Sequence, residues 1–227
     1  MCGRFYLVTP ASELAQQFQM ELPQLRPRYN IAPQQATLAC RLEDGRRRPA
    51  LLQWGLVPAW ADDPGIGERM INARCETAAE KPSFRNALRS RRCLIPASGF
   101  YEWRRGPGGK QPFAFRMRDG RPFAFAGIWE HWERPEGLLQ TFAILTTSPN
   151  DVMRPVHDRM PVIVAPRDYD LWLDPGVRDP GRIAHLFAPY PAEAMEAYPV
   201  STRVNNPGND DPMVLERVAE GKTLLDR

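Results

Sequence analysis

Proline is the residue that most restricts the folds open to this chain. The sequence of 227 residues contains 24 prolines, roughly twice the usual share. Proline donates no backbone hydrogen bond and is disfavoured inside helices and central strands. Because the prolines are spread over most of the chain, we expect many loops and short strands instead of long helices.

Alternating apolar residues predict strands along most of the chain. The predicted strands lie at 2–8, 36–42, 51–57, 92–105 (a strand pair or one bent strand), 112–118 and 121–130 on either side of the Asp119-Gly120 turn, 140–150 and 159–166. Residues 106–110 (GPGGK) predict a hairpin turn between two of these strands.

Short helices are predicted between the strands. They lie at 12–20, where Ser12 resembles an N-cap, in the later part of 72–92, and at 168–174 and 181–189. This order of elements indicates a single α+β domain, built as a curved, mostly antiparallel, barrel-like β-sheet with a few flanking short helices. We expect the domain to cover residues 1–205 and residues 206–227 to form a polar, loosely ordered C-terminal tail.

Charge composition narrows the function only weakly. The formal net charge is +3, from 30 basic and 27 acidic residues, which is too small to identify a nucleic-acid-binding protein. Nearly all the basic residues are arginine, whose planar guanidinium suits phosphate. A GC-rich genome would give the same bias, so composition leaves the phosphate interpretation open.

The four cysteines are Cys2, Cys40, Cys75 and Cys93; they form no CxxC pair, and no histidine lies at a zinc-ligand spacing. We therefore expect no metal site and no cofactor. Cys40 and Cys93 lie in apolar, strand-like runs and are predicted core residues, and packing is also the expected role of Cys75. No signal peptide or membrane-spanning apolar run is found, which predicts a cytoplasmic protein.

Cys2 directly follows the initiator methionine. Removal of Met1 would leave Cys2 with a free α-amine, whose pKa of about 7.7–8.0 leaves an appreciable neutral fraction at cellular pH. The amine and the thiol then form a 1,2-aminothiol, which can condense with an aldehyde to close a thiazolidine ring. The alternative is that Cys2 is an ordinary second residue without a chemical role.

Two further residues are candidates for acid–base chemistry. His157 lies in a loop between two predicted strands, beside Asp158 and Arg159, and loops on rigid scaffolds often carry catalytic side chains. Glu102 lies among large apolar residues in GFYEW, a setting that suits general acid–base chemistry if the carboxylate lines a pocket. An outward-facing strand glutamate is the alternative for Glu102.

Asn72 and Arg74 alternate with Ala73 in the INAR motif, so they share one face if this segment is a strand. An amide beside a guanidinium suits an oxyanion or a phosphate. An ordinary polar strand edge is equally consistent with these residues.

Six motifs occur in order: MCGR, YNIAP (29–33), WGLVPAW (54–60), INAR with ETA (71–78), GFYEW (99–103) and HDRMP (157–161). Together with a cysteine at position 2, the set resembles the SOS response-associated peptidase (SRAP) family, whose animal member is the 5-hydroxymethylcytosine-binding protein of embryonic stem cells. The resemblance extends from Cys2 to about Asn205, nearly the whole chain.

The resemblance implies an enzyme of the DNA damage response that senses abasic sites in single-stranded DNA. The α-amine of Cys2 would attack the ring-opened sugar aldehyde to give an imine, and the thiol would close a thiazolidine that cross-links protein and DNA. The family's peptidase activity, a hydrolase reaction with lyase activity as a further option, would remove Met1, although a host aminopeptidase could also do this.

The resemblance also assigns roles to individual residues. Beside Cys2, the catalytic set would comprise Asn72, which holds Cys2 and the adduct, Glu102, which helps open the sugar ring and shuttles protons, and His157, a second acid–base group. The DNA-binding set would comprise Arg4, Arg74 and Arg159 on backbone phosphates and Trp60 stacked on a base. Family members often have a second bulky residue after this tryptophan, where the chain has Ala61.

The expected partner is single-stranded DNA with abasic sites, with no membrane and no metal. We expect a monomer in the cytoplasm, associated with the nucleoid when it is bound to damaged DNA.

Two other functions are weighed against capture of abasic sites. An N-terminal-nucleophile amidotransferase also begins with MCG, but this chain lacks a second synthetase or sugar-phosphate domain. A non-enzymatic reader of modified or single-stranded nucleic acid would use the same arginines but would leave Cys2, Glu102 and His157 without roles.

Overall fold

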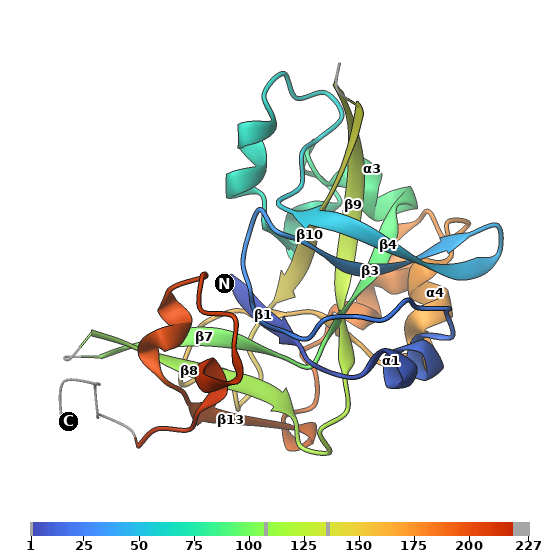
Figure 1. Ribbon diagram of the computed structural model, residues 1–227. Helices are drawn as coiled ribbons and strands as arrows, with labels where there is room; N and C mark the ends of the chain where they lie inside the picture. Colours follow the sequence, from blue (N-terminus) through green and yellow to red (C-terminus); the bar gives the residue numbers. More distant parts are fainter. Residues whose placement is uncertain (1, 107–108, 135–136, 220–227) are drawn as a thin grey trace.

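The computed structural model describes residues 2–106, 109–134 and 137–219, and in it the strands form two connected β structures (Figure 1). The larger one contains a closed barrel and the smaller one is an open antiparallel sheet. Helices are short and lie at the periphery of the strands.

Five strands close the barrel in the order β10-β4-β3-β6-β9, because β9 also pairs with β10. Their bounds are β3 (Ala36–Glu43), β4 (Arg46–Trp54), β6 (Arg92–Ala97), β9 (Phe123–Arg134) and β10 (Gly137–Thr147). All of these pairings are antiparallel except that of β10 with β4. Three short strands extend the barrel wall: β5 (Asn72–Arg74), β11 (Met160–Pro161) and β12 (Ile163–Val164).

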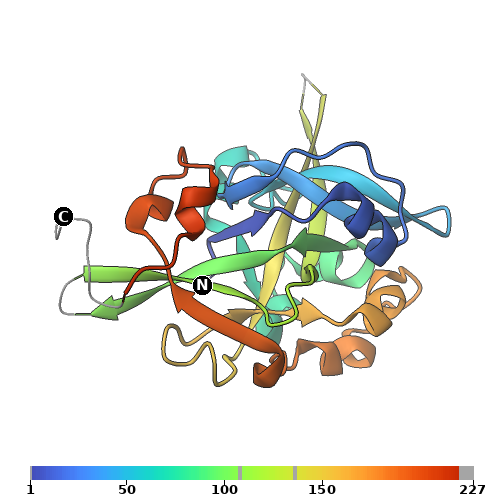
Figure 2. The same cartoon turned by 60° about the horizontal axis from the view of Figure 1, so that its bottom comes forward.

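The second sheet is antiparallel, with the strand order β13-β8-β7-β1-β2. Its strands are β1 (Arg4–Leu7), β2 (Arg28–Ile31), β7 (Gly99–Gly106), β8 (Gly109–Met117) and β13 (Met195–Pro199). The turned view shows the C-terminal segment (red) beside the β7–β8 hairpin (Figure 2). The N-terminal strand β1 lies between β7 and β2 and is therefore an internal strand of this sheet.

The helices in the described parts of the chain are all eight residues or shorter, as the proline content predicts. The α-helices are α1 (Ala11–Phe18), α2 (Cys75–Ala78), α3 (Arg85–Ser90) and α4 (Tyr169–Leu173). The 3-10 helices are η1 (Pro64–Arg69), η2 (Pro166–Asp168), η3 (Pro180–Phe187), η4 (Ala192–Ala194), η5 (Thr202–Asn205) and η6 (Pro212–Leu215).

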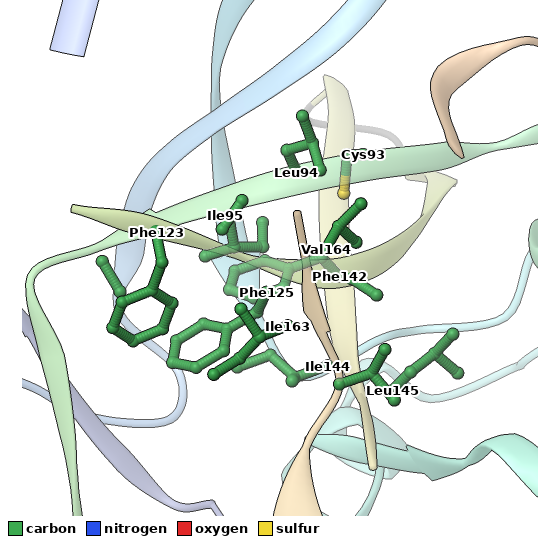
Figure 3. Packing of buried hydrophobic residues seen from close by; sticks show 14 of the residues in the cluster. Cys93, Leu94, Ile95, Phe123, Phe125, Phe142, Ile144, Leu145, Ile163 and Val164 are labelled. Carbon is green, nitrogen blue, oxygen red and sulfur yellow. The ribbon is translucent and has the colours of Figure 1, made fainter. Parts of the chain in front are cut away.

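The main core fills the barrel (Figure 3). It continues to the second sheet, which contributes residues such as Phe5 and Phe100 to the same cluster. Phe125 on β9 is fully buried and makes edge contacts with Phe100 on β7 (6.0 Å) and Phe5 on β1 (5.5 Å). Such aromatic pairs bury large areas and add specific geometry. These contacts join the two β structures into one domain.

The structure confirms the predicted α+β fold and its barrel-like, mostly antiparallel sheet. It also confirms the predicted burial of Cys40 and Cys93, which are both fully buried. The hairpin turn at 106–110 falls partly outside the described residues, but Gly106 and Gly109 pair at its base.

Two local predictions are wrong. The Asp119-Gly120 turn joins no hairpin, because β8 belongs to the small sheet and β9 to the barrel. Ser12 does not cap α1, which begins at Ala11 behind Pro10 without a side-chain cap. The strand pair or bent strand predicted at 92–105 corresponds to two strands, β6 and β7, which belong to different sheets.

Residues 206–219, which were predicted to belong to a polar tail, pack against the domain. Val214 is fully buried, and Arg217 forms a β-bridge with Val200. Asp210 accepts hydrogen bonds from the backbone N–H groups of Tyr29 (2.5 Å) and Asn30 (2.9 Å). The polar composition of this segment did not predict its packing. The reason is that the Asp210 carboxylate binds main-chain N–H groups far away in the sequence.

We expect Asp210→Ala to destabilise the protein by about 2–3 kcal/mol, because two backbone donors would lose their acceptor. Urea unfolding measures this loss. Asp211→Ala, which removes the exposed cap of η6 (Asp211 Oδ1 to Met213 N, 2.9 Å), should cost only about 1 kcal/mol. Equal losses for the two variants would contradict the role given to Asp210.

Candidate active site around the N-terminal strand

Strand β1 fixes the position of Cys2. It lies between β7 and β2, with Arg4 opposite Tyr101 and Phe5 opposite Phe100 and Ile31. Phe5 is fully buried, and its ring lies 5.2 Å from that of Trp54. Because β1 is anchored on both edges and in the core, Cys2 is held at its start with 0% exposure.

Asn72 connects the barrel to Cys2. It lies on β5, which is paired with β10, and its Nδ2 donates a 2.7 Å hydrogen bond to the main-chain oxygen of Cys2. The Oδ1 atom of Asn72 is buried and accepts no hydrogen bond from any described residue. Such an acceptor is costly to leave unsatisfied, which is typical of a site that awaits a donor.

Glu102 approaches Cys2 from the second sheet. Arg4 pairs with Tyr101, so one further step of this register sets Gly3 opposite Glu102. Burial raises the pKa of the Cys2 thiol well above its usual range, and the charge of Glu102 raises it further. Glu102 is itself only 5% exposed, and its Oε1 accepts a hydrogen bond from the N–H of Trp103 (3.1 Å).

His157 has partners for both of its protonation states. Its Nδ1 accepts a hydrogen bond from the N–H of Arg159 (3.0 Å), which places the proton of a neutral ring on Nε2. The same Nδ1 lies 2.9 Å from Oδ1 of Asp158, a contact that suits the imidazolium. A ring with a partner in each state is suited to proton transfer.

A pocket of about 440 Å³ brings these acid–base groups together. It is lined by Glu102, Trp103, Arg105, Lys110, His157 and Asn205. Sequence analysis missed four of these residues. Arg105 directly precedes the predicted GPGGK turn and Lys110 is its last residue, but the turn signal assigned no role to either. Trp103 ends the GFYEW motif without an assigned role, and no sequence signal indicated Asn205, whose Oδ1 accepts a hydrogen bond from Trp103 Nε1 (2.7 Å).

The three arginines expected to bind phosphate differ in their surroundings. Arg74 is exposed at the end of β5. Arg4 is half-buried and donates to Asn30 Oδ1 and to the main-chain oxygen of Val204, both at 2.9 Å. Burial lowers the pKa of Arg4. Arg4 therefore contributes to the fold, whereas Arg74 is accessible.

Arg159 makes a two-pronged ion pair with Glu76, at 2.6 and 2.8 Å, and also donates to the main-chain oxygen of Thr146 at 2.6 Å. Only 15% of its side chain is exposed. A phosphate would have to compete with Glu76 for this guanidinium. Trp60, in contrast, is 58% exposed, as a base-stacking residue requires.

Other predicted features lie away from this site. His131 and His185 are surface residues on β9 and η3. Within the described parts of the chain, no group of His, Cys, Asp and Glu side chains is arranged to hold a metal ion. None of the described helices has the length and apolar character needed to cross a membrane.

Comparisons with known proteins identify close relatives. The family model described as SOS response associated peptidase (SRAP) matches residues 1–207. The abasic site processing protein YoqW of Bacillus subtilis (strain 168) is 46% identical over 222 residues, covering 95% of this chain and 99% of that protein. The abasic site processing protein HMCES of Gallus gallus is 33% identical over 86% of this chain and 68% of its own length. A crystal structure of a protein from Bacteroides thetaiotaomicron superposes with a TM-score of 0.87 at 27% identity, covering 96% of this chain and all of that one.

The Arg159–Glu76 pair predicts a defined pH dependence. The hydrogen bonds from Arg159 lower the pKa of Glu76 to about 2, against about 4.3 in an unfolded chain. The pair therefore stabilises the protein fully above the unfolded value and is lost as the pH falls from there toward 2.

We expect Glu76→Gln to lower the free energy of unfolding by about 1 kcal/mol at pH 7, because the carboxylate is half exposed and screened. The difference from the wild type should shrink between pH 5 and about 2. Urea unfolding over this pH range measures it, with Glu80→Gln, at an exposed glutamate of the same segment, as the control. A pH-independent difference would contradict the assignment.

Proposed function

The chain belongs to the SRAP family, and from this premise we propose that it captures abasic sites in single-stranded DNA through a thiazolidine formed by Cys2, as part of the DNA damage response. The observation that carries the proposal is the contact of Asn72 with the main chain of a fully buried Cys2 beside Glu102. The abasic-site processing named for the relatives YoqW and HMCES supports it.

The reaction requires the α-amine of Cys2, so removal of Met1 comes first. The neutral amine then attacks C1′ of the ring-opened deoxyribose, and loss of one water gives the imine. The buried Oδ1 of Asn72, to which no described residue donates, is an acceptor for a proton of this amine. The side-chain amide of Asn72 thereby binds Cys2 at two points, its main-chain carbonyl and its α-amine.

The thiol closes the ring in the second step. Burial keeps its pKa high, so sulfur enters the reaction as a protonated thiol and not as a competing thiolate. Sulfur adds to the imine carbon while its proton is transferred to nitrogen. In total, an aldehyde and an aminothiol give a thiazolidine and one water.

Glu102 and His157 supply the proton transfers. Glu102 helps open the hemiacetal ring and moves protons to and from the amine, and His157, on the same pocket, is the second acid–base group. Arg4, Arg74, Arg159 and Trp60 form the proposed DNA contacts. Arg74 and Trp60 are accessible for this role, whereas Arg159 must exchange its carboxylate partner.

We further propose that the protein removes its own Met1, acts as a monomer in the cytoplasm and associates with the nucleoid on damaged DNA. The Glu102–Asn72 setting around Cys2 supports cleavage of the preceding peptide bond by the Cys2 thiol. An amidotransferase is the second candidate, but the family model covers the chain from residue 1 to residue 207 as one SRAP unit.

We expect Cys2→Ala to abolish the heat-stable adduct with an abasic oligonucleotide, because no thiol remains to close the ring. This variant has no thiol to remove Met1, so an aminopeptidase is used to remove it. The free α-amine should then still form an imine that borohydride traps. Denaturing gels and intact mass, which also reports the loss of Met1, measure both products. Cys40→Ala, which removes a thiol from the barrel wall, is the control, and a heat-stable Cys2→Ala adduct without borohydride would overturn the proposal.

Glu102→Gln preserves the shape of the side chain but cannot transfer a proton. We expect single-turnover cross-linking at pH 7 to slow by about 100-fold or more. The exposed Glu133→Gln variant on β9 controls for the loss of one negative charge. Equal rates for the two variants would remove Glu102 from the catalytic set.

A further inference from the structure

Strand β7 extends well beyond its partner β1. The pairing begins with Arg4 opposite Tyr101, but β7 continues to Gly106 and pairs there only with β8 among the described strands. The β7–β8 hairpin therefore forms an arm that projects from the sheet beside the N-terminus (Figures 1 and 2). The open edge of this arm starts where Cys2 lies.

Two cations face each other on the arm. Arg105 and Lys110 are direct cross-strand partners, so their side chains share one face of the hairpin, and like charges at such positions destabilise a sheet. Both are exposed, and neither forms an ion pair with a described residue. The arrangement costs stability unless an anion lies between them.

Another like-charged pair on a hairpin shows how the fold compensates elsewhere. Arg41 and Arg48 also lie opposite each other, on β3 and β4. Arg41, however, forms an ion pair with Glu43 (2.5 Å) and stacks on Trp129 at 4.4 Å. No such compensation by a described residue accompanies Arg105 and Lys110.

The arm pair also belongs to the acid–base pocket. Arg105 and Lys110 line the same 440 Å³ pocket as Glu102 and His157, and Glu102 is the only acidic residue among the described residues that line it. A polyanion that places its reactive group at Cys2 would continue past these two cations.

We propose that Arg105 and Lys110 bind backbone phosphates of the DNA strand on one side of the abasic nucleotide. Arg74, on strand β5 of the barrel wall, would then bind phosphate on the other side of the abasic nucleotide. This inference rests on the proposed function and adds to it: the arm would set the direction in which single-stranded DNA crosses the site. Guanidinium and ammonium groups both bind phosphate through charge-assisted hydrogen bonds.

The test uses the double variant Arg105→Ala/Lys110→Ala. Fluorescence anisotropy with undamaged oligothymidylate should show a loss of affinity of about tenfold at low salt, and the slope of log K against log salt should fall by about 1.4, the value for two phosphate contacts on a single strand. Arg46→Ala/Arg48→Ala, the same charge change on the exposed β3–β4 hairpin, is the matched control and should change both quantities little.

Direction is tested by cross-linking rates with two abasic oligonucleotides, one with nucleotides only on the 5′ side and one with nucleotides only on the 3′ side. The double variant should slow the reaction of one and not the other. Equal slowing of both, or slowing equal to that of the control, indicates a general electrostatic effect and would overturn the proposal. Charged edges also keep protein chains from pairing, and a role confined to that would leave DNA binding unchanged and equally overturn it.

The two proposals fail separately. A wild-type protein that forms no adduct would overturn the proposed capture of abasic sites, while anisotropy would still measure the contribution of the arm. A normal wild-type adduct, with identical behaviour of the arm variant and the control, would overturn the arm alone.

Discussion

The arrangement of the candidate active site around Cys2 depends on the packing of the buried Phe5 ring. Chain termini are usually poorly ordered unless they are anchored. Here the ring of Phe5 lies between Trp54 of the barrel and Phe125, at 5.2 and 5.5 Å, and β1 is paired on both edges. The entropy lost by ordering this terminus is offset by aromatic burial three residues away from Cys2. Cys2 thus has a fixed position relative to both β structures.

That fixed position allows the two β structures to contribute different groups to one site. The barrel contributes Asn72, whose amide contacts the main chain of Cys2, and the small sheet contributes the carboxylate of Glu102. Neither sheet alone could surround Cys2 in this way. Burial between the barrel and the small sheet also raises the pKa of the Cys2 thiol. Under the proposed mechanism, the amine therefore attacks the aldehyde first, and the protonated thiol closes the ring in the second step.

Local sequence patterns predicted the strands well, because alternation and turn residues are local properties. They could not predict pairing: the Asp119-Gly120 turn has the composition of a hairpin but joins two sheets. The candidate residues Cys2, Asn72 and Glu102 were named from their motifs, and the structure brings them together. The partner of Arg159, by contrast, lies 83 residues away in sequence, and Asp210 contacts the backbone of β2 across about 180 residues. Such contacts leave no periodic signal.

The state of each arginine decides what the protein can offer to a phosphate. Arg4 and Arg159 are held by protein acceptors, so binding to them must displace existing contacts, whereas Arg74, Arg105 and Lys110 are exposed. Under the proposed function, accessible cations near Cys2 on a chain of net charge +3 would give modest, salt-sensitive affinity for any single strand. Under the proposed function that is sufficient, because reversible contacts need only bring an aldehyde to Cys2. The thiazolidine then supplies both the selectivity for abasic sites and the lifetime of the complex.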